Sequence, residues 1–195
     1  LHSVKAGNFG DPTFASQTNV RPDILLHILN QGYTVLWTDS DMVWMSDPSP
    51  FLPDINDPDV VRPSLPTPNI AHTGSGIPCT CIMFMKPVES VKDLVIRWGQ
   101  TIVEMHAVQD QASTKSFQEP FHQAEAGIHY DVFPKLNFPS GKFLSKGTHE
   151  GRFARVHGGD LVVFHNNFII GHDHKIQRFK EFDLWGVDNV SFPTC

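Results

Sequence analysis

The sequence has little charge and no long apolar run, and each shortage argues against a class of protein. Only 18% of the residues are charged, the formal net charge is -6, and no basic stripe is present. We therefore expect no nucleic-acid partner, because such proteins normally carry a basic surface. No apolar run approaches the length that crosses a bilayer, and the first residues show no signal-peptide pattern. We also find no internal repeat and no low-complexity tract.

The length and apolar content allow one sizeable hydrophobic core. With 195 residues, of which 40% are hydrophobic, the chain predicts a single globular domain over residues 1–195. The first residue is Leu1 and not Met, so we expect a fragment or a processed form. We expect that an upstream membrane anchor or further strands could then be missing from it.

Three cysteines leave the redox state open. Cys79 and Cys81 flank a single residue, a spacing that we expect to be too tight for an easy mutual disulfide, so an oxidised member would favour Cys195 as its partner. Buried free thiols are the alternative that we favour slightly. A glycosylation sequon at Asn189 is consistent with a secretory lumen.

Apolar periodicity predicts alternating helices and strands, and hence an α/β sheet with helices on its faces. The first helix is expected over 22–31, with Pro22 in its first turn and Gly32 as a left-handed cap. The other predicted elements are strands over 33–37 and 80–85, a long amphipathic helix over 88–106, short buried strands over 130–133 and 161–164, and a loop over 47–68 with a short strand near Val60 and Val61.

Two carboxylates, Asp39 and Asp41, directly follow the strand predicted over 33–37. Because side chains two residues apart leave an extended strand on the same face, both carboxylates could bind one divalent cation. Mg²⁺ or Mn²⁺ suits such oxygen ligands and keeps positions open for substrate phosphates. The alternative is an acidic turn after a strand, and the short motif by itself does not decide between the two.

A second group of polar residues follows the last predicted strand. His165 is a competent Mn²⁺ ligand, Gly171 allows a close backbone approach, and Lys175 can neutralise a phosphate oxygen. The alternative for His165 is a hydrogen bond within a loop. His172 and His174 suggest a zinc site, but no second pair at a structural spacing completes it, so we expect both at the surface or in a supporting role.

Two further places carry groups that could bind sugar hydroxyls or a phosphate. Asp110 and Gln111 can hold sugar hydroxyls, since the amide offers both a donor and an acceptor; a polar helix end is the alternative. Arg21 precedes a predicted helix, where the helix dipole also favours anions, so it could contact a phosphate. It could equally be a solvated charge.

Taken together, these blocks resemble the nucleotide-diphospho-sugar transferases, the family that includes plant pectin xylosyltransferases and extensin arabinosyltransferases. They run in the family order across most of the chain. The matching blocks are Arg21-Pro22 with the helix that follows, 32–44, 79–84, Asp110-Gln111, 138–141, and 165–167 with Gly171, Lys175 and Arg178-Phe179.

The resemblance implies a retaining, Mn²⁺- or Mg²⁺-dependent glycosyltransferase of the GT-A type that uses a UDP-sugar. The implied fold is α/β, with a mixed, mostly parallel sheet, helices on both faces and an N-terminus that lacks the nucleotide-binding strand. The implied site residues are Asp39, Asp41 and His165 for the metal, Asp110 and Gln111 for the sugar and the chemistry, and Arg21, Gly171 and Lys175 for the diphosphate.

The family also implies the biological setting. The donor would be UDP-xylose, UDP-arabinose or UDP-galactose, and the acceptor a cell-wall polysaccharide or a glycoprotein. The full-length protein would be a single-pass type II membrane protein of the Golgi lumen, with its anchor outside this chain.

Two rival interpretations are open. The first is an Asp-x-Asp phosphotransferase, in which the first aspartate is a nucleophile; it needs a later acidic metal motif, and Gly159-Asp160 lacks the required second carboxylate. The second is a catalytically inactive relative that binds sugar.

Overall fold

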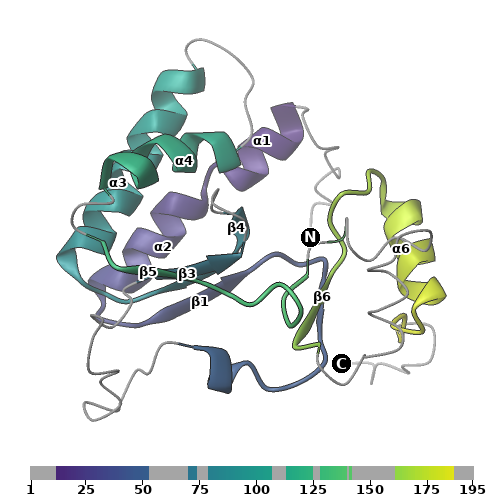
Figure 1. Ribbon diagram of the computed structural model, residues 1–195. Helices are drawn as coiled ribbons and strands as arrows, with labels where there is room; N and C mark the ends of the chain where they lie inside the picture. The colour runs from purple at the N-terminus through teal and green to yellow at the C-terminus, as the bar shows by residue number, and fades with distance from the viewer. Residues whose placement is uncertain are drawn as a thin grey trace, which may run out of the picture. The chain divides into compact units, whose positions relative to one another are not determined.

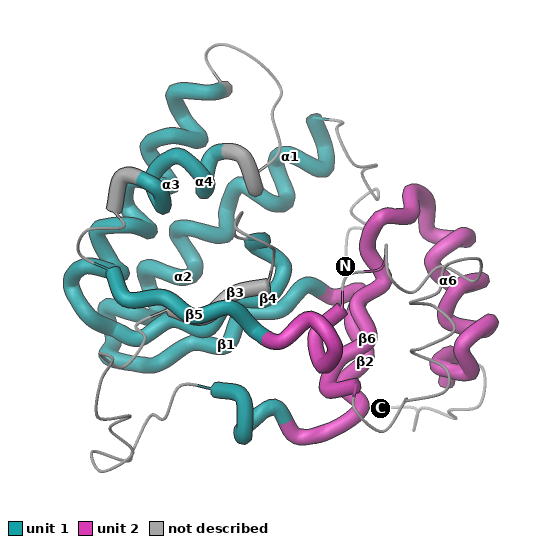
Figure 2. The backbone as a smooth tube through the Cα atoms, viewed as in Figure 1, with its two compact units in different colours: residues 1–39, 48–133 teal, residues 40–47, 134–195 magenta. Residues whose placement is uncertain are grey.

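The computed structural model describes residues 12–52, 70–73, 79–106, 113–124, 128–139, 141 and 161–186 (Figure 1). The chain divides into two compact units (Figure 2). Unit 1 comprises residues 1–39 and 48–133, and unit 2 comprises residues 40–47 and 134–195. The assignment of all 195 residues to one catalytic domain stays a prediction.

Unit 1 contains a four-stranded sheet in the order β1-β4-β3-β5. The strands are β1 (Val35–Thr38), β3 (Ile70–Thr73), β4 (Cys79–Met85) and β5 (Tyr130–Val132). β4 pairs antiparallel with β1 and β3, whereas β5 pairs parallel with β3. β4 therefore lies inside the sheet, which explains why its apolar run from Cys81 to Met85 is buried.

The prediction of a mostly parallel sheet is wrong for the described strands. Parallel neighbours need a long crossover, usually helical, whereas antiparallel neighbours need only a short connection. The connection from β3 to β4 spans residues 74–78 alone, and these two strands are antiparallel. Among the paired strands of this sheet, only β3 and β5 have described α-helices between them in the chain, and they are the parallel pair. The described α-helices of unit 1 lie on one side of its sheet in Figure 1, whereas helices were expected on both faces.

Helix α2 (Arg21–Asn30) confirms the helix predicted over 22–31, with its start one residue earlier. Pro22 lies in its first turn, and Leu25 and Leu29 are fully buried. Gly32 has a φ of 84°, the left-handed conformation that glycine adopts without a steric penalty. After this cap the chain continues into β1, which begins at Val35. The short helix α1 (Pro12–Thr18) precedes α2 and was not predicted.

The core of unit 1 forms between α2, β4 and two further helices. Helix α3 (Glu89–His106) has the predicted apolar stripe, and α4 (Ser113–Ala124) is a helix that the sequence did not predict. Trp98 is fully buried, donates from Nε1 to Ser116 Oγ at 3.1 Å and meets the Phe117 ring edge-on. The buried cluster comprises Leu25, Leu29, Val35, Met83, Met85, Val91, Leu94, Val95, Trp98, Ile102, Phe117, Phe121 and Ile128.

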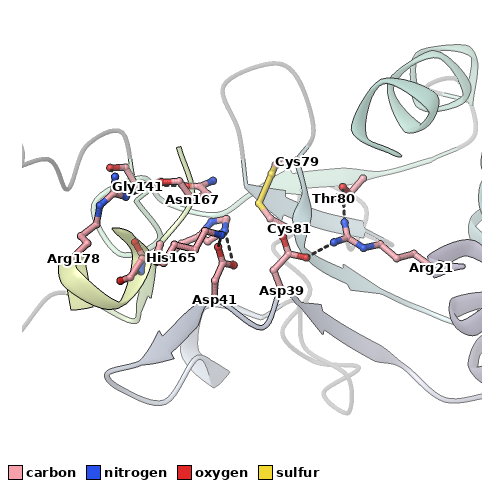
Figure 3. Close-up of polar contacts among 12 residues, drawn as sticks. Arg21, Asp39, Asp41, Cys79, Thr80, Cys81, Gly141, His165, Asn167 and Arg178 are labelled. Atoms are coloured by element: carbon pink, nitrogen blue, oxygen red, sulfur yellow. Dashed lines mark hydrogen bonds and ion pairs between the residues drawn. A yellow bond between two sulfur atoms is a disulfide. The ribbon is translucent and has the colours of Figure 1, made fainter. Parts of the chain in front are cut away.

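Cys79 and Cys81 form a disulfide with each other, so the prediction that this spacing is too tight is wrong (Figure 3). Their Cα atoms are 5.3 Å apart, inside the usual range for bridged cysteines. The physical reason is twofold. Side chains two residues apart on a strand leave on the same face, and an irregularity in the pairing of β3 with β4 falls at this place. Cys195 lies outside the described residues.

Unit 2 pairs β2 (Met42–Trp44) with β6 (Val163–His165) in antiparallel register and adds helix α6 (His172–Glu181). Phe164 on β6 packs against Phe179 and Phe182, with ring centroids 5.9 and 4.8 Å away. The buried strand predicted over 161–164 is therefore confirmed, with a shift of its bounds.

Two other predicted segments have different outcomes. β5 lies where a strand was expected over 130–133, but its three residues are exposed and not buried. Within the loop predicted over 47–68, a 3-10 helix, η1 (Ser49–Phe51), is described, and the strand expected near Val60 and Val61 falls outside the described residues. Among the described helices, none combines the length and apolarity that spanning a bilayer requires.

We expect Trp98→Ala to reduce the free energy of unfolding by about 3–5 kcal/mol, because it empties a fully buried site. Val103→Ala on the same helix is the matched control: Val103 is 71% exposed, so its removal should cost no more than about 0.5 kcal/mol. Urea unfolding followed by circular dichroism measures both. Equal stabilities of the two variants would contradict the assignment of Trp98 to the core.

Candidate functional site

In unit 2, strand pairing brings Asp41 next to His165. β2 and β6 place Met42 opposite His165, and the Asn166 N–H donates to the Asp41 carbonyl at 2.9 Å. Asp41 Oδ1 then lies 3.5 Å from His165 Nε2, and Asp41 Oδ2 accepts a 2.6 Å hydrogen bond from Lys175 Nζ. Figure 3 shows Asp41 and His165 facing each other. Three residues expected to take part in binding thus meet within one unit.

Asp41 is ionised at neutral pH. Burial by itself raises the pKa of this carboxyl, but its contacts with His165 and Lys175 outweigh burial and hold the pKa well below the usual range. The carboxylate therefore keeps its negative charge under physiological conditions. A charged carboxylate is the form that coordinates a divalent cation.

The His165 imidazole fits a metal ligand better than a loop hydrogen bond. The residue is only 2% exposed, and its Nε2 atom is buried with no hydrogen-bond partner. A buried polar atom without a partner is costly unless another species satisfies it. Neighbouring ligands bound at about 2.0–2.2 Å lie roughly 3–3.5 Å apart, and the distance from Nε2 to Asp41 Oδ1 is 3.5 Å. The donor set of an imidazole and a carboxylate suits Mn²⁺.

Helix α6 begins beside this group. Gly171 is its N-cap, with a φ of 96° that favours glycine. Lys175 lies in the first turn of the helix, and the Asn166 side chain donates to its carbonyl at 2.8 Å. The residue that follows β6 thus holds the backbone of Lys175. His172 and His174, considered above for zinc, are exposed as expected.

A second set of contacts joins the segment after β5 to the segment after β6. The Gly141 N–H donates to the Asn167 side-chain oxygen, and Arg178 Nη1 donates to the Asn167 carbonyl at 2.7 Å (Figure 3). A methyl group on Gly141 would overlap that carbonyl. The residues 138–141, 165–167 and Arg178-Phe179 are predicted only as family blocks, and no role is predicted for Asn166, Asn167 or Arg178. For the two asparagines, the available signal is their position directly after His165.

In unit 1, Asp39 forms hydrogen bonds with Cys81, near the start of β4, and with Arg21. Its N–H donates to the Cys81 carbonyl at 2.9 Å, and Arg21 Nη2 donates to its Oδ1 at 2.7 Å. Arg21 Nη1 also donates to Thr80 Oγ1 at 3.2 Å, and the guanidinium lies 5.8 Å from the Trp37 ring centroid. Arg21 is therefore a partnered side chain, 14% exposed, and not a solvated charge.

The acidic pair does not continue the strand as expected. β1 ends at Thr38 and β2 begins at Met42, so Asp39, Ser40 and Asp41 form the connection between the two strands. The same-face argument for an extended strand therefore does not apply to them. Asp110 and Gln111 lie outside the described residues.

Comparison with known proteins gives consistent relatives. A family model for nucleotide-diphospho-sugar transferases matches residues 2–179. UDP-D-xylose:L-fucose alpha-1,3-D-xylosyltransferase 3 of Arabidopsis thaliana is 31% identical over 97% of this chain and 52% of its own length. UDP-galactose:fucoside alpha-3-galactosyltransferase of Dictyostelium discoideum is 26% identical over 97% of this chain and 31% of its own. The chain thus spans about half the length of the plant relative. No solved structure shows a significant match.

We expect Gly141→Ala to destabilise unit 2 by about 1–3 kcal/mol, because its methyl group would displace the Asn167 carbonyl and the Arg178 guanidinium. Gly186→Ala is the control, since nothing lies within 4 Å of a methyl group there. Thermal unfolding of both variants tests this. A Gly141→Ala protein as stable as the control would show that the close approach is not required.

Proposed function

This chain belongs to the nucleotide-diphospho-sugar transferase family, and from that premise we propose that it is the metal- and diphosphate-binding part of a UDP-sugar glycosyltransferase. The observation that carries the proposal is the group of Asp41, His165 and Lys175 in unit 2. It combines two potential metal ligands with one cation that can meet a phosphate. Such a combination suits a nucleotide diphosphate bound through a divalent metal ion.

We propose Asp39, Asp41 and His165 as the ligands of Mn²⁺ or Mg²⁺. Only Ser40 separates the two aspartates, so their Cα atoms can be at most about 7 Å apart. This covalent limit supports a shared cation. The buried Nε2 atom of His165, which makes no hydrogen bond, would add a nitrogen ligand, and this favours Mn²⁺ over Mg²⁺.

Lys175, Gly171 and Arg21 are proposed to hold the diphosphate. Lys175 Nζ has three donors, so it can keep its bond to Asp41 and still donate to a phosphate oxygen. Gly171 starts helix α6, and helix N-termini favour anions. Arg21 uses two of its five N–H donors on Asp39 and Thr80, which leaves donors that can reach a phosphate.

The chemistry requires stabilisation of the leaving group. Cleavage of the bond from the anomeric carbon leaves negative charge on UDP, and a bound divalent cation supplies Lewis-acid stabilisation of that charge. Lys175 would add a positive charge to the same oxygens. Retention of configuration would proceed either through a carboxylate nucleophile or by attack on the same face. Asp110 is the carboxylate that we nominate, with Gln111 beside it to hold sugar hydroxyls.

The proposed substrates follow the family and its named relatives. The donor is a UDP-pentose or UDP-galactose, since the relatives are named as xylosyl- and galactosyltransferases. The acceptor is a polysaccharide or a glycoprotein, and the proposed site of action is the Golgi lumen, with a membrane anchor outside this chain.

We expect Asp41→Asn to lower donor-dependent UDP release by at least about a hundredfold. The substitution removes a negatively charged metal ligand, and the bound metal ion would stabilise the transition state by several kcal/mol. The assay uses the full-length protein with Mn²⁺ and, in turn, UDP-xylose, UDP-arabinofuranose and UDP-galactose. Asp93→Asn, on an exposed position of α3, is the matched control and should retain activity.

Full activity of Asp41→Asn would defeat the proposal. Carbohydrate binding by the wild-type protein without turnover of any UDP-sugar would favour an inactive sugar-binding relative. Hydrolysis of a generic aryl phosphate in place of UDP release would favour the phosphotransferase interpretation.

We expect His165→Ala to weaken Mn²⁺ binding by at least about tenfold. Loss of a residue that only orients a metal ligand already lowers metal affinity by about that factor, and loss of the ligand itself should lower it no less. Isothermal titration calorimetry measures the affinity. His172→Ala is the control, because the His172 side chain is 80% exposed and should not change Mn²⁺ binding. Equal affinities of His165→Ala and wild type would remove His165 from the proposed ligand set.

A further inference from the structure

We infer that Thr80, locked between two disulfide-bonded cysteines, is a positioning residue for Asp39 that acts through Arg21. The inference rests on the proposed function, because it treats Asp39 as a metal ligand. It concerns unit 1 alone, where all the residues involved are described.

The first step is an irregularity in β4. Its pairing with β3 runs regularly from Met85 to Met83 and then jumps, so that Thr73, the next residue of β3, lies opposite Cys79. Thr80 lies in this irregular stretch, between the two cysteines of the disulfide. The covalent bridge restricts the backbone of the residue that it encloses.

The second step is the burial of Thr80. The residue is only 1% exposed, and its hydroxyl oxygen accepts from Arg21 Nη1 at 3.2 Å (Figure 3). Arg21 comes from the start of α2, which is a different element. The hydroxyl thus holds one arm of the guanidinium, which also lies over the Trp37 ring, 5.8 Å from its centroid.

The third step is the hold on Asp39. The other arm of the guanidinium donates to Asp39 Oδ1 at 2.7 Å, while the Cys81 carbonyl accepts the Asp39 N–H at 2.9 Å. The segment 79–81 therefore holds Asp39 twice: directly through its backbone, and indirectly through Thr80 and Arg21. Groups that orient a metal ligand in this way raise metal affinity.

A role in general stability explains this arrangement less well. A disulfide stabilises mainly by closing a loop in the unfolded chain, and a shorter loop gives a smaller gain. The loop between Cys79 and Cys81 is as short as one intervening residue allows. We therefore expect the bridge to influence local geometry more than global stability.

Thr80→Val tests the positioning role, because it removes the hydroxyl and keeps the shape. We expect Mn²⁺ affinity of the full-length protein, measured by calorimetry, to fall about three- to tenfold, below the range typical of direct supporting residues. Thr80→Ser, which keeps the hydroxyl, should restore most of the affinity. Thr18→Val is the matched control: Thr18 is also buried, but its hydroxyl bonds to carbonyls of its own helix.

The double variant Cys79→Ser/Cys81→Ser tests the disulfide. We expect a similar loss of Mn²⁺ affinity with little change in the melting temperature. Adding Thr80→Val to it should cause less than the sum of the two losses, because both changes act on the same contact.

The outcomes separate the two proposals. Wild-type protein that binds no Mn²⁺ would overturn the proposed function and this inference with it. Wild-type protein that binds Mn²⁺, with Thr80→Val and the double cysteine variant binding it equally well, would overturn this inference alone. Loss of affinity in Thr80→Val that Thr80→Ser does not restore would also overturn it.

Discussion

The antiparallel pairing of β2 with β6 is the constraint on which the candidate chemistry of unit 2 depends. Its register sets Met42 opposite His165, and from there the Asn166 N–H reaches the Asp41 carbonyl. Asp41 and His165 are far apart in the chain, and neither could approach the other without this pairing. A shift by one residue would turn the His165 imidazole to the opposite face. The backbone of Lys175 is held from the end of the same strand, through the side chain of Asn166.

Both aspartates of the acidic motif are held by a cation from a helix. Arg21 at the start of α2 holds Asp39, and Lys175 in the first turn of α6 holds Asp41. Partly buried carboxylates need such partners, because an unpaired buried charge is costly. The same cations suit a polyanionic substrate, since a guanidinium and an ammonium group can both donate to phosphate oxygens. The same basic side chains can therefore neutralise the two aspartates and bind a phosphate group.

Prediction from the sequence was most successful where apolar periodicity was strong. Helices α2 and α3 and strand β4 bury regular apolar positions, and all three were predicted. Helix α6 has no buried residue and a mostly polar sequence, so no apolar stripe revealed it. Helix α4 contains Pro120, a residue that argues against a helix when only the sequence is read. Strands β2 and β3 are three and four residues long, too short for a period of two to stand out.

The sequence by itself determined the chemical inventory and its order along the chain: the acidic pair, the histidine after the last strand, the lysine that follows it, and the family to which these blocks belong. Only the tertiary structure decided which of these groups meet. Lys175 contacts Asp41, Arg21 contacts Asp39 and Thr80, and Cys79 is bonded to Cys81. The physical reason is that partners distant in sequence are chosen by strand register and helix packing. Even the short-range disulfide coincides with an irregularity in the pairing of β3 with β4, which the spacing of the two cysteines does not reveal.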